Sequence, residues 1–329
     1  MRGLNEALRA IRSAKSIAIS GHLNPDGDSL GSLLSLGLGL ETIGKKIYML
    51  YQGEVPPTYQ SLPGIRKLRR AMRGSVDLAI AVDCGARELL GRHRSVFNTA
   101  KETLEIDHHE YRRSFCRLQL VDARAAAVGE LIYLILSALK VSFSPAIAEN
   151  VLTSVIVETN LFKLSYVRPF TFFVCAELLK TRISFARLVD KVYGPKTKKE
   201  ALLSALCISR SVFLEKGRLV WSIIKKEDFK RLKAKNYDVD AVASEMCAIR
   251  GVEVALLFRE ETPGELRVSL RSKGDVNIAT VAESFGGGGH FDIAGCYILY
   301  RKKTIEKLIE AAGRQLPFLK TTRGNNGNS

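Results

Sequence analysis

The chain has 329 residues, 46% of them hydrophobic, which is enough for one large or two ordinary domains with a substantial core. No apolar run reaches the roughly 18 residues that a membrane span needs, and the N-terminus lacks the apolar region of a signal peptide. We therefore expect a cytoplasmic protein with no membrane partner. The six cysteines form no CxxC pair, which argues for reduced, buried thiols. The net charge of +16 favours a polyanionic partner such as nucleic acid.

The first part of the chain alternates short apolar runs with helical patterns, which is typical of a doubly wound parallel sheet. The expected strands cover 15–20, 46–51, 76–82 and 102–106. The expected helices cover 2–14, 30–43, 126–139 and 144–158, and two further helical patterns extend to 192. We therefore predict an α/β fold with a doubly wound parallel sheet in its N-terminal domain.

Acidic and histidine side chains follow three of these expected strands. In chain order they are His22, Asp26, Asp28, Asp83, Asp107, His108 and His109. Within the first loop, Asp28 and Ser29 are expected to cap the helix that follows. Because open parallel sheets place their sites at the carboxyl ends of the strands, we expect all these side chains to lie close together.

A second, smaller unit of α+β type is expected after the polar stretch 193–199, which contains Gly and Pro and is the best linker candidate. Its expected strands cover 211–215, 218–224, 252–259, 265–271 and 294–300. Its expected helices cover 227–234, 239–249, 276–285 and 303–316. The predicted organisation is a domain at 1–190, a linker at 191–199, a second domain at 200–316 and a disordered tail at 317–329, with a cleft between the domains.

Four consecutive glycines followed by a histidine, Gly286 to His290, interrupt this second unit. Glycine is costly inside a helix or strand, so the run is expected to form a loop. Such a loop can aim several N–H groups at one anion. A flexible linker is the alternative, but the run lies between an expected helix and an expected strand. We predict a phosphate-binding loop with His290 at its edge.

The aspartates and histidines also suit a metal site. Carboxylate oxygens and imidazole nitrogens are suitable ligands for Mn²⁺ or a similar divalent ion. Two such ions about 3.5–4 Å apart can bind the attacking and leaving oxygens of a phosphoryl group, and water bound to them ionises near neutral pH. Helix capping and turn formation are the simpler alternative, but they do not explain why His22 accompanies the aspartates. The fifth histidine, His93, is expected on the surface.

Together these motifs resemble the DHH phosphoesterase superfamily with its DHH-associated C-terminal domain. The motifs that carry the resemblance are His22-x3-Asp26-x-Asp28, Val82-Asp83, Asp107-His108-His109 and the glycine run ending at His290. They occur in the expected order across about residues 1–315. Length and domain content are most similar to the branch of nanoRNases and pAp phosphatases, the bifunctional oligoribonucleases. The resemblance implies a metal-binding catalytic domain at 1–190 and a substrate-binding domain at 200–316.

The resemblance also implies two Mn²⁺ ions per chain, with Mg²⁺ or Co²⁺ as alternatives. The implied ligands are His22, Asp26 and Asp83 for one ion, and Asp28, Asp83, His108 and Glu158 for the other. Asp83 would bridge the two ions, Asp107 would orient a histidine, and His109 would face the scissile phosphate. The implied substrate-binding residues are Arg271, Ser272, Gly287, Gly288, Gly289 and His290. The planar fork of an arginine suits a terminal phosphate, although a solvated arginine at a strand end is the alternative.

Two departures from the family pattern bear on activity. The fourth motif normally reads Asp-Thr-Gly-x-Phe, whereas this chain has Glu158-Thr-Asn160-Leu-Phe162. Glutamate keeps the carboxylate but adds a methylene, and Asn160 is acceptable if its backbone is left-handed. The DHH motif is usually followed by Ser-Asn, where this chain has Tyr111-Arg112. Arg112 and Arg113 would either meet substrate phosphate or form surface charge.

The predicted function is Mn²⁺-dependent hydrolysis of short oligoribonucleotides to mononucleotides, with pAp to AMP as a second reaction. One alternative is a phosphodiesterase for pGpG, pApA or a cyclic dinucleotide, and another is a degenerate nucleotide-binding protein without catalysis. The predicted partners are short RNA and nucleotides such as pAp, and a homodimer is left open. Most basic runs, such as Arg66-Lys-Leu-Arg-Arg70, are expected on solvated helix faces. Any that line the cleft between the domains would steer RNA ends inward. The scarcity of aromatic residues among the basic runs favours substrates of a few nucleotides.

Overall fold

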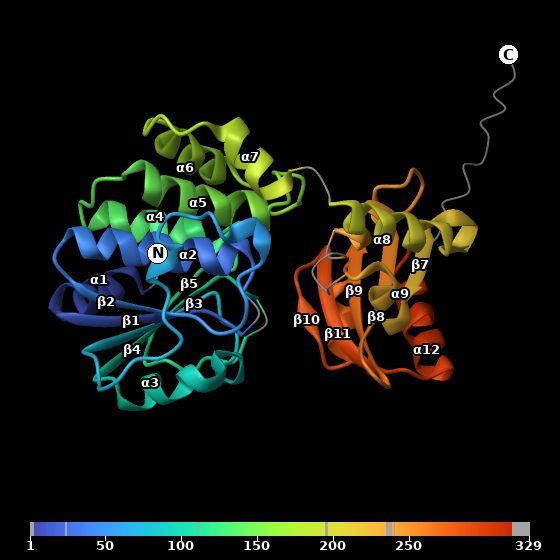
Figure 1. The fold of residues 1–329 in the computed structure, drawn as a ribbon, viewed down its shortest axis with the longest axis horizontal. Helices are drawn as coiled ribbons and strands as arrows, with labels where there is room; N and C mark the ends of the chain where they lie inside the picture. Colours follow the sequence, from blue (N-terminus) through green and yellow to red (C-terminus); the bar gives the residue numbers. More distant parts are fainter. Residues whose placement is uncertain are drawn as a thin grey trace, which may run out of the picture. The chain divides into compact units, whose positions relative to one another are not determined.

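The computed structural model describes residues 3–23, 25–110, 112–194, 197–234, 239 and 241–317. It divides into two compact units, Met1–Pro195 and Lys196–Ser329, and each is described by itself (Figure 1). Tyr111, residues 195–196 of the expected linker, residue 240 of an expected helix and residues 318–329 of the expected tail lie outside the described residues. No helix in the described part of the chain is long and apolar enough to cross a membrane. All six cysteines are buried and none forms a disulfide.

The first unit contains a five-stranded, fully parallel sheet, as predicted. The strands are β1 (Ser16–Ser20), β2 (Lys46–Leu50), β3 (Leu78–Val82), β4 (Glu102–Asp107) and β5 (Leu118–Val121), in the order β2-β1-β3-β4-β5. The α-helices are α1 (Leu4–Ser13), α2 (Gly27–Thr42), α3 (Arg94–Thr99), α4 (Val128–Ala138), α5 (Pro145–Glu158), α6 (Pro169–Leu179) and α7 (Phe185–Tyr193). Three 3₁₀ helices are η1 (Pro57–Tyr59), η2 (Ile65–Lys67) and η3 (Arg87–His93).

Both faces of this sheet are covered, which explains why its strands read as continuous apolar runs. Helices α2, α4 and α5 lie on one face and α3 lies on the other (Figure 1). In β1, the side chains of Ile17 and Ile19 belong to the larger core on the α2 side, whereas Ala18 belongs to the smaller core on the α3 side. Ala79 and Ala81 of β3 also belong to this smaller core, where they pack with larger side chains such as Phe97.

Three details of the first unit differ from the sequence predictions. Strand β5 was not expected, because it has only four residues and only one of them is fully buried. Helix α2 begins at Gly27, and its N-cap is Asp26, whose carboxylate accepts a hydrogen bond from the Ser29 N–H. The prediction that His93 is a surface residue is wrong. His93 is 2% exposed, and its ring nitrogens lie 2.8 Å from Ser20 Oγ and 3.1 Å from the Arg70 carbonyl oxygen.

The second unit contains a six-stranded mixed sheet with the order β10-β11-β9-β8-β7-β6. The strands are β6 (Val212–Leu214), β7 (Leu219–Ile224), β8 (Val254–Thr262), β9 (Glu265–Ser272), β10 (Gly288–Gly289) and β11 (Ile293–Leu299). The helices are α8 (Lys198–Ser209), η4 (Glu215–Gly217), α9 (Lys226–Leu232), α10 (Val242–Cys247), α11 (Ala279–Ser284) and α12 (Lys302–Gly313). Only β7 and β8 pair in parallel, which matches the predicted mostly antiparallel or mixed sheet.

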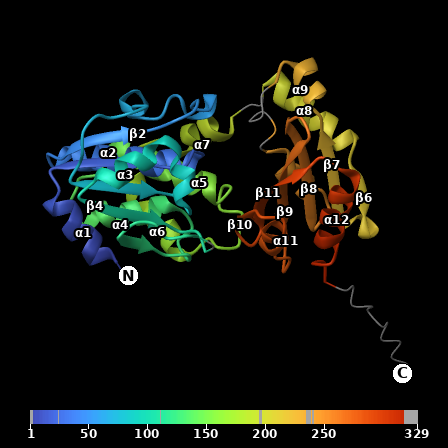
Figure 2. The ribbon, with the colours of Figure 1, turned by 90° about the horizontal axis from the view of Figure 1, so that it is seen from below.

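Helices again cover both faces of this second sheet. Helices α8, α9 and α10 enclose one apolar core, and α11 and α12 enclose the other. Figure 2 labels α8, α9, α11 and α12 beside the strands of this sheet. Helix α8 was not predicted. It begins with a capping box in which Thr197 and Glu200 each bond the backbone of the other, so residues 198–199 of the expected linker are helical.

A buried carboxylate holds α6 against α4 in the first unit. Glu130 of α4 has no exposed surface, and its two oxygens accept from Thr171 Oγ1 at 2.5 Å and from Arg168 Nη2 at 3.0 Å. Both donors belong to the start of α6. Because a buried carboxylate is costly without a partner, this pair fixes the position of the segment that follows α5.

Removal of the arginine should therefore destabilise the first unit. We expect Arg168→Ala to lower the free energy of unfolding by about 3 kcal/mol, because Glu130 would keep its buried charge without its cation. Urea unfolding measures the loss. Lys180→Ala is the matched control, since it removes a solvent-exposed ion pair with Glu177 and should cost less than about 1 kcal/mol. Equal losses for the two variants would contradict the assigned role of Glu130.

Candidate functional site

The carboxyl ends of three parallel strands carry the acidic and histidine residues that the sequence analysis singled out. His22 follows β1, Asp83 follows β3 directly, and Asp107 is the last residue of β4. Asp28 is the second residue of α2 and Glu158 is the last residue of α5. The structure brings these side chains together at one edge of the sheet, although they span 137 positions of the sequence (158 − 22 + 1).

Asp83 lies at the centre of this cluster, and it has an unusual backbone. Its φ of +52° is in the left-handed region, which is rare for residues other than glycine and often marks a functional position. Its Oδ2 lies 3.6 Å from His22 Nε2, and its Oδ1 lies 4.0 Å from His108 Nε2 and 3.7 Å from His109 Nδ1. The two carboxylate oxygens of one residue thus face different histidines.

Asp28 is held in place by hydrogen bonds from three elements. Its Oδ1 accepts from Ser154 Oγ at 2.5 Å and from Ser32 Oγ at 3.1 Å, and its Oδ2 accepts from the Val128 N–H at 3.0 Å. Burial, together with the charges of Asp83 and Glu158, raises the pKa of Asp28 well above its usual value. A carboxylate this deeply buried among other carboxylates needs either a proton or a cation.

The ring of His108 is oriented by a backbone carbonyl. Its Nδ1 lies 2.9 Å from the Ala125 carbonyl oxygen, so Nδ1 carries the proton and donates it. Its Nε2 then faces carboxylate oxygens, at 3.6 Å from Asp28 Oδ2 and 3.7 Å from Glu158 Oε1. A nitrogen lone pair and carboxylate oxygens that converge at these separations leave room for a shared cation, which is the arrangement of a metal site.

His109 is bonded to Asp107 instead. Its Nδ1 donates to Asp107 Oδ1 at 2.7 Å, and the same oxygen accepts from the N–H groups of His108 and His109. Burial alone would lower the pKa of His109, but the hydrogen bond to Asp107 and the nearby carboxylates raise it to about 10. Asp107 therefore orients the ring and favours its protonated form.

Among the described clusters of potential ligand atoms, two in this unit share no residue with each other. His22, Asp26 and Asp83 form one, and Asp28, His108 and Glu158 form the other, with all ligand atoms of a group within 4.8 Å of one another. Asp83 contributes to the first group through its carboxylate and also faces His108 of the second. Oxygen and imidazole donors in both groups suit hard or borderline divalent ions. The side chains therefore fit two neighbouring divalent cations.

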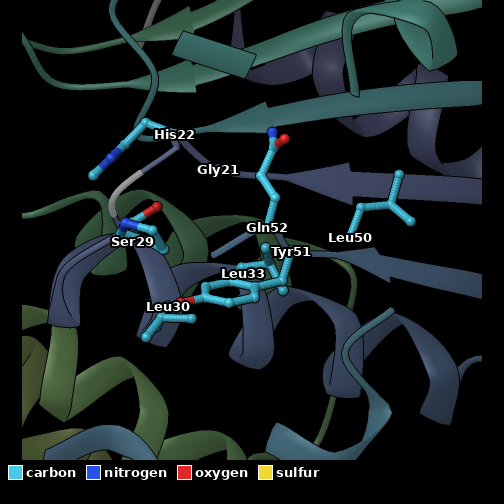
Figure 3. Close-up of a pocket in the computed structure, with 9 residues that line it drawn as sticks. Gly21, His22, Ser29, Leu30, Leu33, Leu50, Tyr51 and Gln52 are labelled. Carbon is cyan, nitrogen blue, oxygen red and sulfur yellow. The ribbon is translucent and has the colours of Figure 1, made fainter. Parts of the chain in front are cut away.

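A pocket lies beside the first ligand group, between α2 and the ends of β1 and β2. Its lining includes Gly21, His22, Pro25, Ser29, Leu30, Leu33, Leu50, Tyr51 and Gln52 (Figure 3). The hydroxyls of Ser29 and Tyr51 are buried there and have no hydrogen-bond partner among the described residues. Burial, with the charge of Glu54, raises the pKa of Tyr51 to about 12. This wall of the site therefore combines apolar side chains with the neutral hydroxyls of Ser29 and Tyr51.

In the turn after Glu158, the backbone of Asn160 is left-handed, which is the condition under which asparagine is acceptable there. Asn160, Leu161 and Phe162 have φ values of +45°, +56° and +62°, so three successive residues are left-handed. The Phe162 N–H donates to Thr159 Oγ1, which also donates to the Val155 carbonyl. The turn ends α5 abruptly and leaves Glu158 as its last helical residue.

Substitutions at Asn160 should report this backbone conformation. We expect Asn160→Val to be roughly 1–2 kcal/mol less stable than Asn160→Gly, because a β-branched residue is strongly disfavoured in the left-handed region. Urea unfolding of the two variants gives the difference directly. Equal stability of the valine and glycine variants would mean that the left-handed turn does not form.

Arg112, which follows the DHH motif, has a structural role. Its Nη1 donates to Glu105 Oε1 at 2.8 Å, and Glu105 on β4 has no exposed surface. This contact supplies a counter-charge inside the unit and makes Arg112 an unsuitable ligand for substrate phosphate. Arg113 is exposed, as one of the two alternatives proposed for it requires.

Part of the glycine run is a short strand, and not only a loop as predicted from the sequence. Gly288 and Gly289 form the edge strand β10, paired with β11. The N–H groups of Gly286, Gly287 and His290 donate to the carbonyls of Glu283, Ala282 and Ile293. The glycines instead permit close packing of chain segments. A Cβ at Gly287 would lie 2.1 Å from the Gly295 carbonyl oxygen, and one at Gly289 would lie 2.4 Å from that of Ile293.

The other two residues predicted to bind substrate lie at the end of β9 in the same unit. Arg271 Nε donates to Ser244 Oγ at 3.1 Å, and its Nη1 donates to the Leu270 carbonyl at 2.9 Å. Ser272 is 8% exposed and its hydroxyl donates to the Val276 carbonyl at 2.7 Å. The hydroxyl of Ser272 is therefore used inside the unit, whereas the guanidinium of Arg271 is half-buried and held in one orientation.

Several residues that position the ligands were not found from the sequence. Ser154, which bonds Asp28, is 126 residues away along the chain. One signal was available, because Ser154 is a polar residue on the buried face of an otherwise apolar helix. The carbonyl of Ala125 carried no signal, since any residue supplies a carbonyl group.

Two domain families match the chain. Residues 16–157 match the DHH family, N-terminal domain, and residues 219–316 match the DHHA1 domain. The first match ends one residue before Glu158, and the second includes Arg271 and the glycine run. The two matches fall within the two compact units, one in each.

Similar proteins cover nearly the whole chain. The bifunctional oligoribonuclease and PAP phosphatase NrnA of Thermus thermophilus is 27% identical over 321 residues, which is 96% of this chain and 94% of that protein. The protein of the same name from Bacillus subtilis is 24% identical over 87% of this chain and 90% of its own length. The cyclic-di-AMP phosphodiesterase GdpP of Geobacillus thermodenitrificans is 24% identical over 90% of this chain but only 47% of its own length.

Solved structures share the fold. An exopolyphosphatase-related protein from Bacteroides fragilis has a TM-score of 0.85 at 22% identity and covers 95% of this chain and 96% of its own. RecJ from Thermus thermophilus, solved in complex with Mn²⁺, has a TM-score of 0.57 at 14% identity and covers 96% of this chain and 55% of its own. Likeness at these identities shows a common fold and nothing more.

Proposed function

Because the chain belongs to the DHH family, with its N-terminal domain followed by a DHHA1 domain, we propose that it hydrolyses phosphoester bonds with two divalent cations. The proposed substrates are short oligoribonucleotides, cleaved to mononucleotides, and pAp, cleaved to AMP. One observation carries the proposal, namely that the two oxygens of Asp83 face two separate groups of ligand atoms. The relatives named oligoribonuclease and PAP phosphatase, which match this chain over most of their length, support the substrate class.

Each ligand group would hold one cation. His22, Asp26 and Asp83 would bind the first, and the second would be bound by Asp28, Asp83, His108 and Glu158. Mn²⁺ is our first choice, because its ligand preferences fit carboxylate and imidazole together. When bound, such a pair lowers the pKa of water and neutralises charge on the phosphoryl oxygens.

The protein's own contribution to the reaction would come from His109. Asp107 accepts the Nδ1 proton of His109, so Nε2 is the ring atom that would contact substrate. Burial lowers the pKa of His109, but the hydrogen bond to Asp107 raises it and favours the protonated ring. His109 would then stabilise charge on the phosphate or donate a proton to the leaving oxygen, a contribution of about 10²–10⁴-fold in rate.

The second unit would contribute substrate binding through Arg271 and His290. The guanidinium of Arg271 is oriented by Ser244 and Leu270 and offers the geometry for a terminal phosphate. Direct contact with substrate has less support for Ser272, because its hydroxyl is buried and bonded inside the unit. It also has less support for the glycine run, because three of the N–H groups there already donate to carbonyls. We propose that Gly287, Gly288 and Gly289 act by shaping the backbone beside His290.

A dinucleotide phosphodiesterase remains the second candidate. Its support is the match to the cyclic-di-AMP phosphodiesterase GdpP, of which this chain covers about half. Both candidates would use the same metal-binding side chains, so only the substrates separate them. A panel of RNA dinucleotide, pAp, pGpG, pApA and cyclic dinucleotide would rank them by kcat/KM.

Turnover of a 5′-labelled RNA dinucleotide in Mn²⁺ is the primary test. We expect wild type to release mononucleotide and Asp83→Ala to lose this activity, because both proposed cations would lose their shared carboxylate ligand. We expect His109→Ala to lower kcat by about 10²–10⁴-fold, because the proton donor is removed. Asp190→Ala, which removes an exposed carboxylate on α7, is the matched control and should leave turnover unchanged. Unaltered turnover in Asp83→Ala would refute the ligand assignment.

Metal binding has a readout that does not depend on activity. Mn²⁺ at about 100 times its Kd should stabilise chelator-treated protein by about 2.7 kcal/mol, which corresponds to roughly 5–10 °C in Tm. Glu158→Gln should reduce this shift and Glu158→Asp should retain it, because only the latter keeps a carboxylate. An identical shift in Asp83→Ala and wild type, measured by thermal melting, would show that Mn²⁺ binds elsewhere.

A further inference from the structure

A run of arginines lies along the outer edge of the first sheet, and nothing in the proposed reaction uses it. Residues 55–76 contain five basic residues and no acidic residue. We call Arg66, Arg69, Arg70 and Arg73 the arginine segment. We expected Arg66 to Arg70 on a solvated helix face, and these arginines are exposed, but Arg69 and Arg70 are not helical. Only Arg66 lies in the short 3₁₀ helix η2, which ends at Lys67.

The backbone of this segment is attached to β2, the edge strand of the sheet. The Tyr51 N–H donates to the Arg69 carbonyl and the Arg69 N–H donates to the Met49 carbonyl, both at 2.9 Å, which forms a parallel bridge between Leu50 and Arg69. The Arg70 carbonyl lies 3.1 Å from Nε2 of the buried His93. The segment is therefore a fixed part of the fold, and its side chains project from a rigid backbone.

The side chains of the segment remain exposed and are not neutralised. All four arginines are exposed, and within the described ranges none of them forms an ion pair. Arg69 lies over the ring of Tyr48 with its guanidinium carbon 5.5 Å from the ring centre, and Lys46 lies over the same ring at 5.5 Å. Two cations share this aromatic ring, which adds to the density of positive charge at the edge.

The segment is close to the candidate active site within the same unit. Leu50, which is bridged to Arg69, and Tyr51, which donates to it, both line the pocket that contains His22 (Figure 3). Charges on an edge strand also discourage unwanted strand pairing. That role would be met by one or two charges, so it does not account for four unpaired arginines beside the site.

We propose that the arginine segment binds the phosphate backbone of single-stranded RNA that extends beyond the reacting nucleotides. Unpaired arginines suit this role because the guanidinium fork matches phosphate oxygens, and a positive track follows a backbone without reading its sequence. The inference rests on the proposed function in one respect, which is that the bound polymer is RNA. The proposed contact lies beyond the reacting nucleotides, so we expect the segment to contribute to longer substrates and not to dinucleotides or pAp.

Binding of a fluorescein-labelled RNA of about 12 nucleotides to chelator-treated protein tests the proposal without turnover. We expect Arg66→Ala/Arg70→Ala to weaken binding about 5–10-fold near physiological salt. The slope of log K against log salt should fall by about 1.4 in magnitude, since each phosphate contact on a single strand contributes about 0.7. The matched control is Arg9→Ala/Arg187→Ala, which removes two exposed arginines elsewhere on the first unit and should change binding less than about twofold.

The outcomes separate this proposal from the proposed function. Wild type and the arginine double variant could both fail to hydrolyse RNA, while the arginine double variant alone loses RNA binding. The proposed function would then fail, and the RNA-binding role of the arginine segment would stand. Equal losses of RNA binding in the two double variants would mean that only net charge matters, which would overturn the proposal. Unchanged RNA binding in both variants would also overturn it. A matching loss of kcat/KM on pAp and on the dinucleotide would place the arginines in the catalytic site and would also overturn it. Thermal melting of both double variants confirms that each remains folded.

Discussion

The left-handed backbone at Asp83 determines where its carboxylate oxygens lie. A residue with a side chain adopts this conformation at a cost of about 1–2 kcal/mol, so the surrounding structure must hold it. Asp83 directly follows β3, the central strand, and its N–H donates to the Ile106 carbonyl on β4. In that position one oxygen faces His22 and the other faces His108. The order of the strands places His22 and His108 on either side of this carboxylate, and α2 and α5 add Asp28 and Glu158 to the cluster.

The sequence was sufficient for the fold class and for grouping the residues at the strand ends, for one physical reason. Parallel strands bring their carboxyl ends to one edge of a sheet, so residues that follow different strands become neighbours whatever their separation in sequence. Hence the sequence alone places His22, Asp83 and His108 in one group. The left-handed condition at Asn160 followed equally from local sterics, and the structure meets it.

Predictions failed where the position of a polar group depended on its hydrogen-bond partner and not on its residue type. His93 was expected in solvent, but Ser20 and the Arg70 carbonyl offer it a buried pair of partners. The N–H groups of the glycine run were expected to face an anion, but nearby carbonyls accept three of them. Arg112 was expected either to meet substrate phosphate or to form surface charge, but it donates to the buried Glu105 on β4. Partners of this kind come from distant parts of the sequence or from backbone atoms, which no residue pattern identifies.

Every side chain of the two ligand groups lies between residues 22 and 158, and the first compact unit ends at Pro195. Domains generally fold as units during synthesis, the N-terminal one first. The first unit can therefore be complete on the ribosome while the rest of the chain is still being translated. A cation captured at that stage would relieve the repulsion between Asp28 and Asp83 before the chain is released. The supply of metal to the nascent chain would then influence how much folded protein a cell obtains.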